Sequence, residues 1–190
     1  MKHILALVLV SLTCAACADD PAPAAAAAAP AAPDGCLADG SGTLVAQLRG
    51  ALTQDIAWNN GDMQCEGGPR PEGNGLRLTF AGPTTGPEGT RQLRFIFGID
   101  LQDAAAGAAR ALPTNITLIM EGEQQLFATR GDQRCAVEAL ERMALPGDGG
   151  HERIHARGYC TSPALDLAGG TSLLVPTFEF TGIVAAGAQP

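Results

Sequence analysis

The stretch LRFIFGIDL, residues 93–101, places a large apolar side chain at every second position, with Arg94 and Asp100 among the intervening residues. Successive side chains of a β-strand point to opposite faces of a sheet. A period of two therefore predicts a strand with one buried and one solvent-facing side. This segment decides the fold class, because a helix would need a period near 3.6.

The same period of two recurs along most of the chain after residue 43. Turn-forming clusters at 59–62 and 84–87 separate these runs. Eight or nine short strands predict a single all-β, sandwich-like domain, with an immunoglobulin-like arrangement left open. The further alternating sets are Leu44, Ala46 and Leu48; Leu52, Ile56 and Trp58; Leu76, Leu78 and Phe80; Ile116, Leu118 and Met120; Gln125, Phe127 and Thr129; and Phe178 and Phe180.

One segment carries two competing signals. Val137–Leu145 consists almost wholly of strong helix formers. We favour a strand, because Pro146–Gly149 forms a strong turn and the residues on either side of it can pair as a hairpin. A helix over 137–145 remains the alternative, and it would remove the hairpin.

Four cysteines of the predicted domain form an even set, which predicts two disulfides in an oxidising compartment. Cys135 and Cys160 lie equidistant from the turn at 146–149, so a hairpin sets them opposite each other. Cys36 with Cys65 follows by elimination. The same hairpin register would place Glu138 opposite Arg157 as a favourable cross-strand charge pair.

Residues 1–16 have the organisation of a secretory signal peptide. Lys2 and His3 precede an apolar run over 4–12, and small residues follow. The sequence Cys14-Ala-Ala-Cys17 resembles a bacterial lipobox, and the resemblance implies acylation of Cys17 as the first mature residue. Lipoboxes usually carry Leu where Cys14 stands. Cleavage by ordinary signal peptidase, releasing a soluble chain that begins at Asp19, is therefore the alternative.

Residues 17–35 are rich in Ala and Pro, which predicts a disordered, semi-extended tether between the lipid and the domain at 36–190. The chain is therefore expected to be exported to the cell envelope and anchored to a membrane. The sequence does not assign the leaflet. A soluble periplasmic or secreted protein is the alternative location.

Charge and composition exclude several functions. Lys2 is the only lysine and belongs to the signal, so no mechanism that needs a lysine nucleophile, base or phosphate ligand is available to the mature chain. The formal net charge is −8, which opposes binding to nucleic acid. We expect no nucleic-acid partner and no cofactor.

The segment His151-Glu-Arg-Ile-His155 matches the H-E-x-x-H zinc motif, in which two His ligands and a Glu base share one face of a helix. Glycines flank the segment, which disfavours a sustained helix. On a strand the two histidines would lie roughly 13 Å apart, too far for one ion. We therefore predict no metal site, with His151, His155 and Glu152 as the residues to examine and Glu179 as a possible third ligand.

Other polar clusters have ordinary structural explanations. Asn59, Asn60 and Asp62, and likewise Asp39 and Ser41, could ligate calcium, but turns favour the same residue types.

Trp58 and Tyr159 are the only Trp and Tyr, and a glycan site would need such rings exposed. Trp58 follows Ile56 in an alternating run and is expected in the core.

These observations predict a non-catalytic envelope lipoprotein that acts as a binding or accessory module for an envelope protein or a glycan. Two alternatives come from other classes. The first is a secreted zinc-dependent hydrolase that uses residues 151–155. The second is a periplasmic inhibitor or immunity-type protein, because a small acidic disulfide-bonded domain suits the blocking of a basic partner.

Overall fold

The computed structural model describes residues 35–72, 74–86, 89–102, 111–123, 125–147 and 149–185. The predicted signal peptide and nearly all of the predicted tether, including Cys17, lie outside these residues. The described part is all-β, with one short 3-10 turn, η1 (Asn60–Asp62). Its strands are β1 (Thr43–Gly50), β2 (Gln54–Asn59), β3 (Gln64–Pro69), β4 (Gly75–Gly86), β5 (Gly89–Asp100), β6 (Leu112–Glu121), β7 (Gln125–Ala128), β8 (Cys135–Ala144), β9 (His151–Cys160), β10 (Ala164–Asp166), β11 (Ser172–Leu174) and β12 (Phe178–Ala185).

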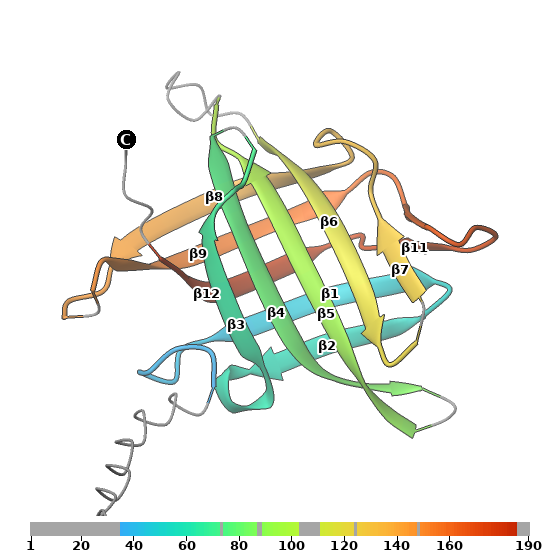
Figure 1. Cartoon of the computed structure of the whole chain (residues 1–190), viewed down its shortest axis with the longest axis horizontal. Helices are drawn as coiled ribbons and strands as arrows, with labels where there is room; N and C mark the ends of the chain where they lie inside the picture. Colours follow the sequence, from blue (N-terminus) through green and yellow to red (C-terminus); the bar gives the residue numbers. More distant parts are fainter. Residues whose placement is uncertain are drawn as a thin grey trace, which may run out of the picture. The chain divides into compact units, whose positions relative to one another are not determined.

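The strands form a sandwich of two antiparallel layers. The first layer is the meander β3-β4-β5-β6, and the second has the order β2-β1-β12-β9-β8. The short strands β7, β10 and β11 continue the hydrogen-bonded path from β6 to β1. Figure 1 shows the green and yellow strands of the first layer crossing the blue, orange and red strands of the second, an arrangement typical of orthogonal sheet packing.

The strand order departs from the immunoglobulin arrangement that the sequence left open. Immunoglobulin sandwiches distribute consecutive strands between their two sheets by Greek-key connections. Here four consecutive strands, β3 to β6, are neighbours in one layer. Each of these strands pairs with the strand that follows it, and sequence alternation does not report this choice.

An aromatic cluster centred on Phe97 joins the two layers. Phe97 lies on β5, and its ring centroid is 4.7 Å from that of Phe180 and 5.0 Å from that of Phe178, both on β12. Phe80 on β4 contacts the same group, at 5.0 Å from Phe180. Gly182 allows this approach, because a Cβ there would lie 2.7 Å from Cζ of Phe80. All four rings are buried.

The alternation of residues 93–101 is confirmed over most of its length. Leu93, Phe95, Phe97 and Ile99 are fully buried, whereas Leu101 lies just beyond the end of β5 and is only partly buried. The prediction for Trp58 is also confirmed, because the indole is buried and donates from Nε1 to the carbonyl oxygen of Pro83 at 2.8 Å. Such a donor needs a partner when it is removed from water.

Leu52 was expected to begin the second strand with Ile56, and this is wrong. Leu52 lies in the turn between β1 and β2, and β2 begins only at Gln54. Gly50, with φ of +120°, ends β1 in a conformation that side-chain-bearing residues rarely adopt. The turn therefore starts earlier than the apolar spacing suggested.

The segment Val137–Leu145 is a strand over nearly all of its length, within β8, and the helix alternative is wrong. Cys135 and Cys160 face each other in the β8–β9 hairpin and form a disulfide. Cys36 and Cys65 form the second disulfide. Tertiary pairing thus overrides the helical propensity of this segment.

The expected pairing of Glu138 with Arg157 is wrong. A β-bulge lies between Val137 and Ala139, and it places Ala139 opposite Arg157. A bulge inserts one extra residue into one strand, so the register shifts by one beyond it. The Cys135–Cys160 disulfide lies on the side of the bulge away from the turn, and it has the register derived from the turn.

We expect Phe97→Ala to lower the free energy of unfolding by about 3–5 kcal/mol, because it removes the ring at the centre of the cluster and leaves a cavity. Ile96→Ala is the matched control, because Ile96 precedes Phe97 and lies on the outer face of the same strand. We expect this variant to lower the free energy of unfolding by only about 1 kcal/mol. Urea unfolding of both variants measures the difference. Equal losses would contradict this core assignment.

Candidate functional site

The segment His151–His155 is the first half of strand β9, not a helix. Ile154 and Ala156 are buried, so alternate residues of β9 point into the core, whereas Arg153 and His155 occupy the outward positions. His151 shares the outward side with His155, and Glu152 belongs to the opposite side. The three residues of the zinc motif therefore do not converge.

The strand also gives these residues other contacts. A carboxylate oxygen of Glu152 accepts a 2.7 Å hydrogen bond from Nε of Arg142 on β8. His155 Nδ1 lies 3.1 Å from Oγ1 of Thr181, and its Nε2 lies 3.6 Å from a carboxylate oxygen of Glu179. Glu179 thus lies near His155 but on strand β12. Within the described ranges, no three His, Cys, Asp or Glu side chains are grouped as metal ligands.

Residues Leu37–Ser41, which we call the N-terminal turn, precede β1 and are held firmly against the domain. Oδ1 of Asn60 accepts hydrogen bonds from the backbone N–H groups of Leu37, at 2.7 Å, and Gly42, at 3.1 Å. The Cys36–Cys65 disulfide ties the same turn to β3. Leu37 is buried as a result. Asn60, a calcium candidate by sequence, thus uses its side-chain oxygen to hold the turn.

Asp39 stands at the tip of the N-terminal turn and has two partners. Its Oδ1 accepts from the hydroxyl and the backbone N–H of Ser41, at 2.7 and 3.0 Å, and its Oδ2 accepts from Nη2 of Arg153. The hydroxyl of Ser41 is the main reason that the pKa of Asp39 lies below its usual value. Asp39 therefore remains ionised at neutral pH and offsets the charge of Arg153.

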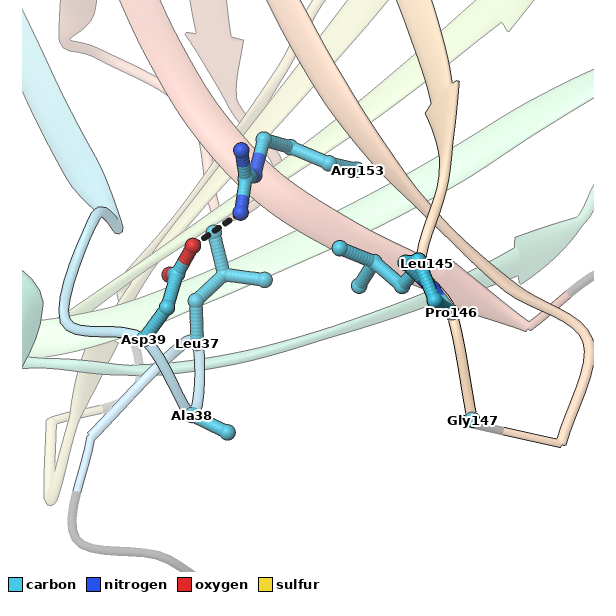
Figure 2. Close-up of a pocket in the computed structure, with 7 residues that line it drawn as sticks. All are labelled: Leu37, Ala38, Asp39, Leu145, Pro146, Gly147 and Arg153. Carbon is cyan, nitrogen blue, oxygen red and sulfur yellow. Dashed lines mark hydrogen bonds and ion pairs between the residues drawn. The ribbon is translucent and has the colours of Figure 1, made fainter.

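A hollow with a cavity volume of about 370 Å³ opens between the N-terminal turn and the loop that follows β8. In Figure 2, Leu37 and Leu145 extend toward one another across this hollow, and Arg153 lies across one end with its guanidinium directed at Asp39. We call it the Arg153 groove. Its lining consists of Leu37, Ala38, Asp39, Leu145, Pro146, Gly147 and Arg153.

The Arg153 groove combines apolar walls with the Arg153–Asp39 ion pair, and one nitrogen of that guanidinium is buried behind the lining. Nε of Arg153 is buried and makes no hydrogen bond, although Nη2 of the same guanidinium is paired with Asp39. A buried donor without an acceptor is unfavourable by about 1–3 kcal/mol. Such groups are rare in folded proteins.

Two further hollows lie on the outer face of the first layer. One, of about 440 Å³, is largely polar and contains Arg94, which is paired with Glu121. The other, of about 300 Å³, contains Arg70 and Asn115, which both donate to Asp132. The Arg153 groove differs from both hollows in its more apolar lining, which includes Leu145 and Pro146.

The sequence did not identify this groove, although it identified several of its parts. Asp39 was recognised as a turn residue and Pro146–Gly147 as part of the hairpin turn, whereas Arg153 appeared only as one residue of the zinc motif. Leu37 and Leu145 lie 108 residues apart in the sequence. Nothing in the local pattern indicates that they meet.

A comparison of the chain with known proteins finds no matching family model, no matching curated protein and no matching solved structure. The described residues include no helix with the length and apolar character of a membrane span.

We expect the protein, purified without chelators, to contain far less than one zinc per chain, because β9 directs Glu152 away from the two histidines. Elemental mass spectrometry measures this content directly. His155→Gln is the matched variant and should leave the content unchanged. A zincin would retain about one zinc per chain and lose it in this variant, and that result would overturn the strand-based reading.

Proposed function

We propose that this protein is an exported cell-envelope lipoprotein, anchored through Cys17, whose β-sandwich acts as a non-catalytic binding or accessory module for another envelope protein. The observation that carries the binding role is the Arg153 groove, which presents apolar side chains beside the Arg153–Asp39 ion pair. Pockets that bind ligands commonly combine an apolar lining with a few polar groups that fix orientation.

The two disulfides support the exported location. Both are formed in the described domain, and disulfides of this kind are typical of proteins that fold outside the reducing cytosol. Each closes a loop of moderate length, with sequence separations of 29 and 25 residues. Such cross-links stabilise a small domain chiefly by restricting its unfolded state.

The position of the groove along the chain suits a membrane-anchored module. Its first wall, Leu37–Asp39, begins two residues after the proposed tether ends at residue 35. A tether of this length spans at most about 65 Å when fully extended. A partner within or close to the membrane is therefore within reach of the groove.

Site-specific photo-crosslinking in native membranes tests this function. A photoreactive residue replaces Ala38 in the groove or Ala57 on β2, both exposed alanines on different parts of the surface. We expect one recurrent envelope protein to be captured from position 38 and not from position 57. Mass spectrometry of the bait should show a diacylglycerol-modified Cys17.

Amine-reactive reagents are unsuitable for this experiment, since Lys2 is the only lysine and belongs to the signal. An unlipidated chain that begins at Asp19, with no companion captured from either position, would overturn the proposal. Equal capture from both positions would show that the companion does not recognise the groove.

A further inference from the structure

We propose that the free edge of strand β8, over residues 139–144, binds an extended, basic segment of the companion protein as an added antiparallel strand. The added strand places a cationic side chain opposite Glu141 and an aliphatic side chain opposite Met143. This inference deepens the proposed function and rests on it, because the segment belongs to the envelope companion. The contact that it adds is made by the backbone of β8.

The outer edge of β8 is free beyond the bulge. β8 is the last strand of the second layer (Figure 1) and pairs with β9 on one side. On the other side it pairs with β6 only at Ala136 and Val137, and no described residue pairs with that side from Ala139 to Ala144. Residues 141–144 are all exposed, whereas a strand that lies on the core has every second residue buried. This half of β8 therefore stands clear of the core.

The hydrogen-bond pattern of the β8–β9 hairpin determines which backbone groups lie along the free edge. The N–H of Leu145 donates to the carbonyl oxygen of His151 at 3.0 Å, so these residues form a hydrogen-bonded pair. In an antiparallel ladder such pairs alternate with pairs whose N–H and C=O groups point away from the partner strand. Leu140, Arg142 and Ala144 therefore direct their backbone groups to the free edge. An extended segment matches this spacing, as in β-strand addition.

The exposed side chains beside the edge select the composition of the added strand. Glu141 and Met143 lie opposite His155 and Arg153, so they share the outward side of β9. Glu141 is exposed and has no ion pair or hydrogen bond within the described part of the chain. Directly opposite residues of an antiparallel pair interact, so Lys or Arg opposite Glu141 and an aliphatic residue opposite Met143 are favourable.

The opposite face of the edge makes no comparable demand for charge. Arg142 points to that face and is already paired with Glu152 of β9. Leu140 lies on the same face and packs partly against the core. The added strand therefore needs one basic residue, at the position opposite Glu141. A formal net charge of −8 also attracts a basic segment to the protein.

A second copy of this chain is a poorer occupant of the edge. Directly opposite residues point to the same face, so a two-fold axis between two β8 strands must place one residue opposite its own copy. An axis through the middle of the free segment places Glu141 opposite Glu141, or Arg142 opposite Arg142. Like charges that are directly opposite destabilise the pair. A basic segment of another protein avoids this repulsion.

The free edge adjoins the Arg153 groove. Met143 lies directly opposite Arg153 in the hairpin, and Leu145 of the groove lining follows Ala144 at the end of the edge. The first residues of an antiparallel strand on this edge therefore lie beside the groove. One companion thus contacts both surfaces.

Hydrogen exchange measured by NMR on the purified full-length protein tests the proposal with a synthetic peptide, acetyl-Thr-Val-Thr-Lys-Val-Thr-amide. Its Lys stands opposite Glu141 and its first Val opposite Met143. In the free protein the amides of Leu140, Arg142 and Ala144 should exchange rapidly, whereas those of Glu141 and Met143 bond to β9 and exchange more slowly. At about 90% occupancy the peptide should slow the first three about tenfold and leave the other two unchanged.

Two changes to the peptide separate backbone recognition from side-chain recognition. N-methylation of the second Thr, opposite Arg142, removes an N–H that faces β8 and should abolish the protection. N-methylation of the Lys is the matched control, because that N–H points away from β8. Replacing the Lys by Glu should weaken binding about fivefold, and Glu141→Lys should reverse this preference.

Three results would overturn the inference. Slow exchange of the Leu140, Arg142 and Ala144 amides in the free protein would show that the edge is already paired. Equal binding of the two N-methylated peptides would exclude an added strand, and an unchanged charge preference in Glu141→Lys would exclude the basic residue. Because the peptide replaces the companion, these failures are distinct from a failure to capture a companion by crosslinking.

Discussion

The burial of Phe97 between the two layers is the contact on which the rest of the domain depends. Its ring is in contact with Phe178 and Phe180 of β12, so the first layer is fixed to the central strand of the second. β12 in turn pairs with β1 and with β9. The N-terminal turn leads into β1, and the β8–β9 hairpin is joined to β12 through β9. The core therefore fixes the positions of both walls of the Arg153 groove.

Much of the fold could be predicted from side-chain period alone, because the burial of one sheet face imposes alternation directly on the sequence. Residues 93–101 show this well, and the turn at 146–149 was enough to pair Cys135 with Cys160. The register of β8 against β9 beyond the bulge at Glu138 could not be predicted, because a single inserted residue does not change the amino-acid composition of the strand in a recognisable way. The assignment of strands to layers also depends on contacts between distant segments, such as Phe97 with Phe180.

The candidate site was harder to predict, because the same residues have different chemistry on a strand and on a helix. On a helix His151 and His155 would share one metal, whereas on β9 they are separated and Arg153 between them becomes the informative residue. Its partner Asp39 lies far away in the sequence. Only the three-dimensional structure shows that Nε of Arg153 has no acceptor and that two leucines flank it.

The most direct measurement of whether this groove is the binding site is a crystal structure of the protein with its captured envelope companion. We expect the companion to occupy the Arg153 groove and to contact Ala38, Leu145 and Pro146 of its lining. A companion bound to the outer face of strands β3–β6, with the groove left open, would contradict this account.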